Sequence, residues 1–362
     1  MPSPRCILIL AAVLYLASAA SFSQQPAPLA AALPAQPGRI TLDALVLDNH
    51  GFPVRGLDAR DFTVTDNGQP RQLLDFHAAA GPSRVVIVLD MINTGFGEVD
   101  WEREQLDQFF AEDGGKLKCP VTLAVMANGG LKMMSGASSD GHVLQAALKQ
   151  FDTALRPVRR QSGFEVDAEL LEMSLGQIAQ VAAVEGSVPG RKMMLVLSPG
   201  WPMMPGAGEG EDLSQRSWVF YTLLTLENGL RESHLSIYSL NPYAAGQSNP
   251  YYYRSFLKNV TQSDQAEYPF LALPLLAKHS GGRAIVMARD ILGALNAAMR
   301  DAGPYYQLTF DEPPADHPNE YRGLLVAADK PGLTVRTDSG YYANPLKPAG
   351  KLVAPRDSVK PF

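Results

Sequence analysis

The chain has 362 residues, of which 46% are hydrophobic and 19% are charged, and this balance is typical of a folded globular protein rather than a disordered one. Its 31 basic and 37 acidic residues give a formal net charge of -6, and they form no block of lysine and arginine. Because nucleic-acid binding requires a concentrated basic face, we expect no nucleic-acid partner. The length suffices for one α/β domain of about 200 residues together with smaller modules.

The N-terminus has the layout of a secretory signal peptide. Arg5 precedes an apolar stretch at residues 7–16, and small residues follow. We predict a signal peptide over residues 1–23, with cleavage near Ala19 or Ser23, and a secreted or periplasmic protein. The apolar stretch is too short for a stable membrane span, so we expect no membrane insertion after cleavage; an uncleaved anchor is the alternative.

Two regions precede the main alternating pattern. Residues 24–38 are rich in proline and alanine and are predicted to be a linker. Residues 39–80 instead show short alternating strands separated by turn residues, which predicts an N-terminal β module. The strands predicted in this module span residues 40–47, 62–65 and 71–76.

From residue 82 to residue 303 the sequence alternates between strand and helix patterns. The predicted strands span residues 84–90, 121–126, 191–197, 234–240 and 283–287. The predicted helices span residues 99–110, 141–154, 168–184, 214–232, 270–278 and 290–302, and a glycine-rich loop precedes the second of them. Strands that alternate with helices of this length predict βαβ crossovers and a doubly wound, mostly parallel sheet.

The chain returns to strand patterns at its end. Residues 304–342 form a predicted C-terminal β segment, with strands at 305–310, 321–327, 333–337 and 340–342. We expect this segment and the N-terminal β module to pack together. Residues 343–362 are rich in proline and lysine and are predicted to be a flexible tail.

The buried strand at residues 84–90 is the most informative part of the α/β region. Its five apolar residues, Val85 to Leu89, predict a strand buried on both faces, and Asp90 follows directly. In open α/β sheets, ligands bind at the carboxyl ends of such strands. We therefore expect Asp90, Asn93 and Thr94 to lie at the ligand-binding edge.

Five segments together resemble one protein family. They read VLDNHGFPVRGLDARDFTVTDNGQPRQLLDF, RVVIVLDMINT, LPLLAKHSGGRAI, DILGALNAAMRDAGPYYQLTF and KPGLTVRTDSGYY. The chain resembles the secreted bacterial proteins that carry a von Willebrand factor type A (VWA) domain, in particular the VWFA-related group. The resemblance implies an α/β fold with a doubly wound, mostly parallel VWA/Rossmann-like sheet, flanked by small N- and C-terminal β segments.

The resemblance also implies a place for a divalent cation. VWA domains usually bind the ion through Asp-x-Ser-x-Ser after the first strand, a Thr in a later loop and an Asp after a central strand. Asp90 matches the first position and Thr94 stands for the second Ser, but Ile92 stands for the first Ser. Ser198 falls where the family has Asp, and Ser162 is the nearest candidate for the loop Thr.

These departures predict a degenerate metal site. Mg²⁺ takes six oxygen ligands and is usually held by one or two carboxylates, whereas Asp90, Thr94 and Ser198 supply one carboxylate and two hydroxyls. We expect no cofactor, with Asp90 and Thr94 instead capping the following turn by hydrogen bonds to backbone N–H groups. Bound Mg²⁺ or another divalent cation is the alternative.

Aromatic residues at the same predicted edge are candidates for partner binding. Tyrosine, tryptophan and arginine are enriched at interface hot spots because they are large, stiff and amphipathic. The candidates are Trp201, Tyr251, Tyr252, Tyr253 and Arg254. The alternative is that these side chains cover the sheet or pack on the β segments.

Signatures of catalysis are weak in this sequence. There is no Gly-x-Ser-x-Gly motif, and the histidines lack metal-pair spacing. We therefore predict a non-enzymatic protein that recognises an unidentified protein partner through the loops at residues 91–98, 198–211 and 242–254. One alternative is metal-dependent adhesion, in which an acidic partner side chain completes the shell of a cation on Asp90. The other is a hydrolase that uses Ser198.

Overall fold

The computed structural model describes residues 38–150, 164–201, 213–243, 260–287 and 289–346. The predicted signal peptide, the predicted linker except Gly38, and most of the predicted tail lie outside these residues. Within them, no helix is long and apolar enough to cross a membrane.

A seven-stranded sheet forms the centre of the described structure. Its strands are β5 (Arg84–Asp90), β6 (Lys116–Ala127), β7 (Gly130–Met133), β8 (Ser138–Asp140), β9 (Lys192–Leu197), β10 (Leu235–Asn241) and β11 (Arg283–Val286). They lie in the order β11-β10-β9-β5-β6-β7, with β8 also paired to β6. All pairs from β11 to β6 are parallel, whereas β7 and β8 run antiparallel to β6. The predicted fold class, a doubly wound and mostly parallel sheet, is confirmed.

The hairpin of β7 with β6 differs from the prediction. The sequence predicted only a glycine-rich loop between the strand at residues 121–126 and the next helix. Instead β6 extends to Ala127, and Gly130 pairs with it after a tight turn in which Gly130 has φ of 103°. The short β7 has little apolar alternation and an exposed Met133, so the usual strand pattern is absent.

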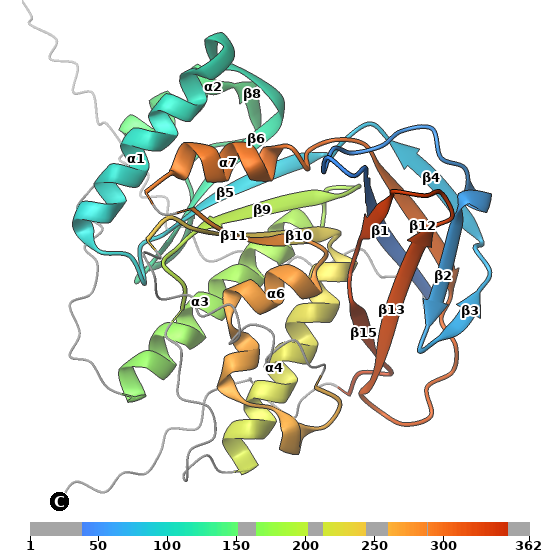
Figure 1. Ribbon diagram of the computed structural model, residues 1–362. Coiled ribbons are helices and arrows are strands. Elements are labelled where there is room, and N and C mark those ends of the chain that lie inside the picture. Colours follow the sequence, from blue (N-terminus) through green and yellow to red (C-terminus); the bar gives the residue numbers. More distant parts are fainter. Residues whose placement is uncertain (1–37, 151–163, 202–212, 244–259, 288, 347–362) are drawn as a thin grey trace, which may run out of the picture.

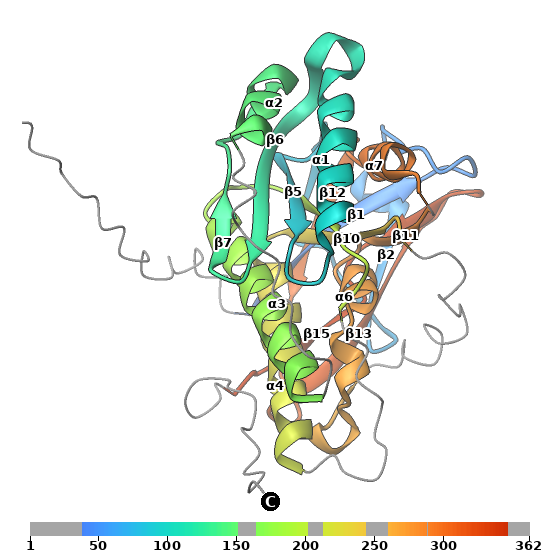
Figure 2. The ribbon, with the colours of Figure 1, turned by 90° about the vertical axis from the view of Figure 1, so that its left-hand side faces the viewer.

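Helices cover both faces of the sheet (Figures 1 and 2). One face carries α1 (Phe96–Ala111), α2 (Gly141–Lys149) and α7 (Ile291–Met299), and the other carries α3 (Phe164–Glu185), α4 (Leu213–Glu232) and α6 (Leu273–His279). In the described segments, short 3-10 helices span Ala59–Asp61, Glu112–Gly115, Ser263–Gln265 and Tyr268–Leu271. Each face therefore has its own hydrophobic core, and the central strand β5 contributes to both: Val85 and Ile87 to one, Val86 and Val88 to the other.

The two terminal β segments form a sandwich beside the α/β unit (Figure 1). The strands of one sheet are β14 (Thr334–Arg336), β1 (Arg39–Leu47), β12 (Tyr305–Asp311) and β4 (Asp75–Ala79), in that order. The strands of the other are β15 (Gly340–Ala343), β13 (Glu320–Ala328), β2 (Phe62–Asp66) and β3 (Gln69–Arg71). Both sheets mix N- and C-terminal strands around one apolar core, so the expected packing of the two segments is observed.

One predicted strand in the N-terminal segment was wrong. The sequence predicted a single strand over residues 71–76, but β3 ends at Arg71 and β4 begins at Asp75. The chain passes from one sheet of the sandwich to the other between these residues, because β3 pairs with β2 whereas β4 pairs with β12. A strand that changes sheets must break its hydrogen-bond ladder.

The sandwich contacts the amino ends of the parallel strands. Arg191, just before β9, donates its backbone N–H to the hydroxyl of Tyr305 on β12 at 3.0 Å. His234, just before β10, places Nδ1 3.0 Å from Oδ2 of Asp43 on β1. The carboxyl ends of β5 and β9 lie at the opposite edge of the sheet, away from the sandwich (Figure 1).

Protonation of His234 is expected to stabilise this contact. Burial disfavours the charged imidazolium, but the hydrogen bond and the attraction of Asp43 outweigh it and raise the pKa of His234 above 6.5. This stabilisation is fully present below about pH 6.5 and is lost as the pH rises through the raised pKa. We expect Asp43→Asn to lower the free energy of unfolding by about 2 kcal/mol at about pH 6, and by less at about pH 8.5. Urea unfolding at both pH values measures the difference, and an equal loss at both would contradict the assignment.

Candidate functional site

The structure brings Asp90 and Ser198 together at the carboxyl edge of the sheet. Asp90 is the last residue of β5, and Ser198 directly follows the neighbouring strand β9. The strand order reverses between these two strands, which is where open α/β sheets bind ligands. Ser198 donates its Oγ hydrogen to Oδ2 of Asp90 at 2.7 Å, and both residues are fully buried.

The carboxylate of Asp90 accepts four hydrogen bonds. The backbone N–H groups of Ile92 and Asn93 donate to Oδ1 at 3.0 and 3.2 Å. The Asn93 side chain donates from Nδ2 to Oδ2 at 2.8 Å, beside the bond from Ser198. Burial raises the pKa of Asp90, while these hydrogen bonds oppose the rise. Asp90 therefore stabilises the turn after β5, as predicted from its position directly after the buried strand.

Thr94 does not share this role, which corrects the prediction that it caps the turn. Thr94 is 4% exposed, and among the described residues its Oγ1 has no hydrogen-bond partner. The side chain of Asn93 stabilises the turn instead of Thr94. Its Nδ2 donates to Asp90 and also contacts Oγ of Ser174 on α3 at 3.0 Å. The inward orientation of Asn93 could not be predicted from the sequence, since loop residues have no fixed periodicity.

This set of groups does not fit a divalent ion held directly on Asp90. Each carboxylate oxygen already accepts two hydrogen bonds, and Ile92 brings a buried apolar side chain to the position of a hydroxyl ligand. Among the described residues, no group of three histidine, cysteine, aspartate or glutamate side chains is arranged to hold a metal. Ser162, the candidate for the loop ligand, lies outside the described residues.

A second buried acid, Glu102, lies on α1 and was not identified from the sequence. It is fully buried, and its Oε1 accepts a hydrogen bond from the Tyr243 hydroxyl at 2.5 Å. Its Oε2 has no hydrogen-bond partner in the part of the chain that the structure describes. The ring of Trp101 packs edge-on against that of Tyr243, with centroids 6.0 Å apart. One signal was available: with Val99 and Leu106, Glu102 occupies the i, i+3, i+7 stripe that a helix turns toward the core.

The environment of Glu102 favours its neutral form. Burial is the main cause that raises its pKa, to about 8, and the hydrogen bond from Tyr243 only partly opposes it. The negative charges of Asp90 and Glu98 raise it further. Burial is also the main cause that raises the pKa of Tyr243, and the charges of Glu102, Glu98 and Asp90 raise it further, so these groups share one electrostatic environment.

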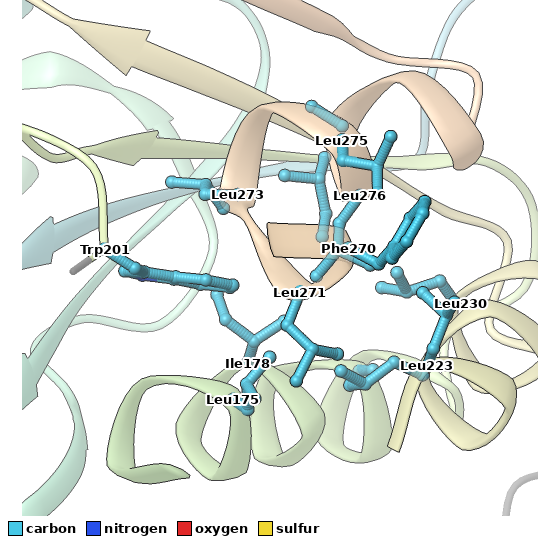
Figure 3. Packing of buried hydrophobic residues seen from close by; sticks show 14 of the residues in the cluster. Leu175, Ile178, Trp201, Leu223, Leu230, Phe270, Leu271, Leu273, Leu275 and Leu276 are labelled. Carbon is cyan, nitrogen blue, oxygen red and sulfur yellow. The ribbon is translucent and has the colours of Figure 1, made fainter. Parts of the chain in front are cut away.

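Trp201 is part of the core rather than an exposed contact residue. Its side chain is 5% exposed and belongs to the hydrophobic cluster between the sheet and helices α3, α4 and α6. Figure 3 shows the indole beside Leu175, Ile178 and Leu273. The prediction that Trp201 contacts a partner is therefore corrected in favour of its alternative, coverage of the sheet. The other four aromatic-loop candidates, Tyr251, Tyr252, Tyr253 and Arg254, lie outside the described residues.

Ser198 has no catalytic base among the described residues. Its hydroxyl donates to Asp90 and accepts from the backbone N–H of Gly200 at 3.1 Å. His234 and His279 pair with acids away from Ser198: His234 contacts Asp43, and His279 contacts Glu227. A serine nucleophile needs a base that can remove its proton, usually a histidine in hydrogen-bond reach. The described geometry gives Ser198 a structural role.

Comparisons with known proteins address the fold. No family model and no curated protein matches the sequence. Similar solved structures include BatB from Bacteroides thetaiotaomicron, with 11% identity, a TM-score of 0.33 and coverage of 60% of this chain and 96% of that one. The SpRpn10 VWA domain has 12% identity, a TM-score of 0.29 and coverage of 61% and 98%. The pilus adhesin SpaC from Lactobacillus rhamnosus GG has 10% identity, a TM-score of 0.31 and coverage of 80% and 49%.

These scores are low, so the fold assignment depends on the topology of the chain itself. Numbered from β5, the strands β5, β6, β7, β9, β10 and β11 lie in the doubly wound order 3-2-1-4-5-6. The α/β unit is VWA-like, as the resemblance in the sequence implied. The comparisons carry no information about a ligand or partner of this chain.

Ionisation of Glu102 is expected to make the protein less stable as the pH rises. The folded state holds the Glu102 proton up to about pH 8, whereas the unfolded chain releases it near the ordinary pKa of 4.5. Between these values each pH unit removes up to about 1.4 kcal/mol of stability. Glu102→Gln removes the titration and keeps an acceptor for Tyr243. We expect the variant to be more stable than the unmodified protein at about pH 8, with the gain vanishing near pH 5.

Thermal unfolding of the unmodified protein and the variant between these pH values measures the gain. Glu104→Gln, at an exposed position of the same helix, is the matched control and is expected to show no such pH-dependent gain. A stability difference for Glu102→Gln that stays constant with pH would contradict the assignment.

Proposed function

We propose that this protein is an exported, non-enzymatic binding module that recognises a protein partner through the loops at the carboxyl edge of its VWA-like sheet. The observation that carries the proposal is the position of the sandwich. Its residues Asp43 and Tyr305 contact the amino ends of β9 and β10, so the opposite edge is the one left for a partner. Export rests on the signal-peptide pattern of residues 1–23.

Recognition in this proposal does not depend on a metal ion. A cation on Asp90 would have to displace hydrogen bonds from Ile92, Asn93 or Ser198, and each displaced donor would then need a new acceptor in a buried site. Those hydrogen bonds instead support a rigid turn that presents the start of α1. Metal-dependent adhesion through Asp90 is the outcome that would overturn this part of the proposal.

Thermal unfolding tests whether the protein binds a divalent metal ion. A ligand that binds only the native state stabilises it by RT ln(1 + [L]/Kd), so a site with Kd of about 0.1 mM would add about 1.4 kcal/mol at about 1 mM metal. We expect no such rise when the protein is freed of metal with EDTA and then given Mg²⁺, Mn²⁺ or Ca²⁺. A metal-dependent rise that disappears in Asp90→Asn would instead establish a cation site on Asp90.

Site-specific crosslinking tests which face binds a partner. Gly97 is exposed at the start of α1, and a Cβ atom at this position meets no other atom within 4 Å, so a photoreactive p-benzoylphenylalanine fits there. Leu325, 65% exposed on β13 of the sandwich, is the matched control position. In the cells that produce the protein, we expect one discrete crosslinked protein from position 97 and none from position 325. The same product from both positions, or a product from position 325 alone, would contradict recognition at the carboxyl edge.

A further inference from the structure

The turn between β14 and β15 fits closely against the α/β unit. We call residues 337–339 the docking turn. The backbone N–H of Ser339 donates to the carbonyl oxygen of His279, at the end of α6, at 3.0 Å. Gly281 has φ of 72°, and a Cβ atom at this position would lie 2.8 Å from the backbone of the docking turn. Glycine therefore permits an approach that any other residue would obstruct.

Two histidines of the α/β unit lie at this contact, and each is paired with a carboxylate. His279 contacts Glu227 on α4 through its Nδ1, and both side chains are buried. His234 places its Nδ1 3.0 Å from Oδ2 of Asp43 on β1. The second pair crosses from the α/β unit to the sandwich, and the first belongs to the residue that accepts the hydrogen bond from Ser339.

The pairing of β1 with β14 brings a second carboxylate toward His234. Leu45 lies opposite Arg336 at the end of this antiparallel ladder. Asp43 stands two residues before this pair, and Asp338 of the docking turn stands two residues after it. The two acids therefore lie at the same end of the strand pair, and the charges of both act on His234.

Asp338 holds its proton more strongly than an ordinary aspartate. Burial is the main cause and raises its pKa to about 6, and the charge of Asp43 adds to the rise. The positive charges of Arg231 on α4 and of His234 oppose it. Ionised Asp338 consequently depends on these cations.

Glu227 has a similar dependence on His279. Burial disfavours the imidazolium of His279, but the attraction and the hydrogen bond of Glu227 outweigh it and raise the pKa of His279 above 6.5. Glu227 also acts on Tyr321 and Tyr342 of the sandwich, where burial and its charge raise the pKa of both hydroxyls. Loss of the proton from His279 removes the cation that offsets this buried charge.

We propose that the docking turn and the two histidines form a pH-sensitive contact between the sandwich and the α/β unit. The contact is closed in mildly acidic solution, where both imidazoles are charged, and the docking turn opens locally as the pH rises past neutrality. This inference is a conformational property of the fold and does not depend on the proposed partner.

The titrating groups of the contact act in the same direction. The two histidines contribute stability below their ordinary pKa of 6.5 and lose it as the pH rises through their raised pKa values. The folded protein holds the Asp338 proton to about pH 6, whereas the unfolded chain releases it near 3.8, so ionisation of Asp338 also removes stability. Lys192, which acts on His234 from β9, has the opposite effect only above about pH 8, because burial lowers its pKa to about that value.

Hydrogen bonds between groups that do not titrate in this range keep the rest of the sandwich in place. Asn228 on α4 donates its Nδ2 to the carbonyl oxygen of Tyr342 on β15 at 2.9 Å, and its Oδ1 accepts the Tyr342 backbone N–H at 3.1 Å. Strand β15 lies beside α4 (Figure 1). The opening is therefore confined to the docking turn.

Amide hydrogen exchange resolved to single residues tests the proposal in the whole protein. After correction for intrinsic exchange, we expect the protection of the Ser339 amide to fall at least about tenfold from about pH 5.5 to about pH 8. The amides of Tyr342 and of Val88, in the core strand β5, are expected to change by less than about threefold. Unchanged protection of Ser339 would overturn the proposal. So would an equal loss at Tyr342 or Val88, because the opening would then not be local.

The variant His234→Asn tests the role of the imidazole. An asparagine stays neutral, carries an N–H donor and tolerates the positive φ of 52° at this position. We expect it to lower Ser339 protection at about pH 5.5 at least about threefold. His77→Asn, at an exposed position on β4 of the sandwich, is the matched control and is expected to leave protection unchanged. Equal effects of the two variants would contradict the proposal.

A second variant, Asp338→Asn, keeps the test valid if His234→Asn folds poorly. Its amide cannot ionise, so we expect Ser339 protection at about pH 8 to rise at least about threefold above that of the unmodified protein. Protection that stays the same or falls at this pH would overturn the proposal.

Discussion

The need to satisfy a fully buried carboxylate determines the local structure of the carboxyl edge. Asp90 ends a strand that is buried on both faces, so solvent cannot supply its hydrogen bonds. The loop after β5 turns back to supply two backbone donors, and Ser198, at the end of β9, supplies a hydroxyl. The side chain of Asn93 then connects this group to α3. One acid thus fixes the relative positions of two strands, a loop and a helix.

Much of the architecture followed from hydrophobic patterning, because long buried segments leave a strong signal. The strands at β5, β9 and β10 and the helices between them were predicted within a few residues of their bounds. The hairpin of β7 and the break between β3 and β4 were not predicted, because short edge strands carry few residues and little periodicity. The sequence predicted the class of the sheet, which is doubly wound and mostly parallel. Only the structure shows that β7 and β8 pair antiparallel to β6.

The candidate site was harder to predict than the fold. Sequence spacing placed Asp90 at the edge and found Ser198 by resemblance, and the structure joins them by one hydrogen bond. Sequence spacing could not show that Thr94 lacks a hydrogen-bond partner among the described residues, that Trp201 is buried, or that Glu102 lies beside Tyr243. These properties depend on contacts between elements far apart in the chain, such as α1 and the residues after β10, and local sequence does not encode such contacts.

The pairing of β1 with β12 has a consequence for the order of events during synthesis. Ile40 lies opposite Phe310, and Ala44 lies opposite Tyr306, so the whole α/β unit is inserted between two strands that pair with each other. The chain emerges from the ribosome N-terminus first, and β1 must wait for more than two hundred intervening residues before its partner exists. The α/β unit is thus the first part able to bury its core, and the sandwich closes last. Chains that stop short of β12 leave a long apolar strand exposed and ready to pair with another molecule.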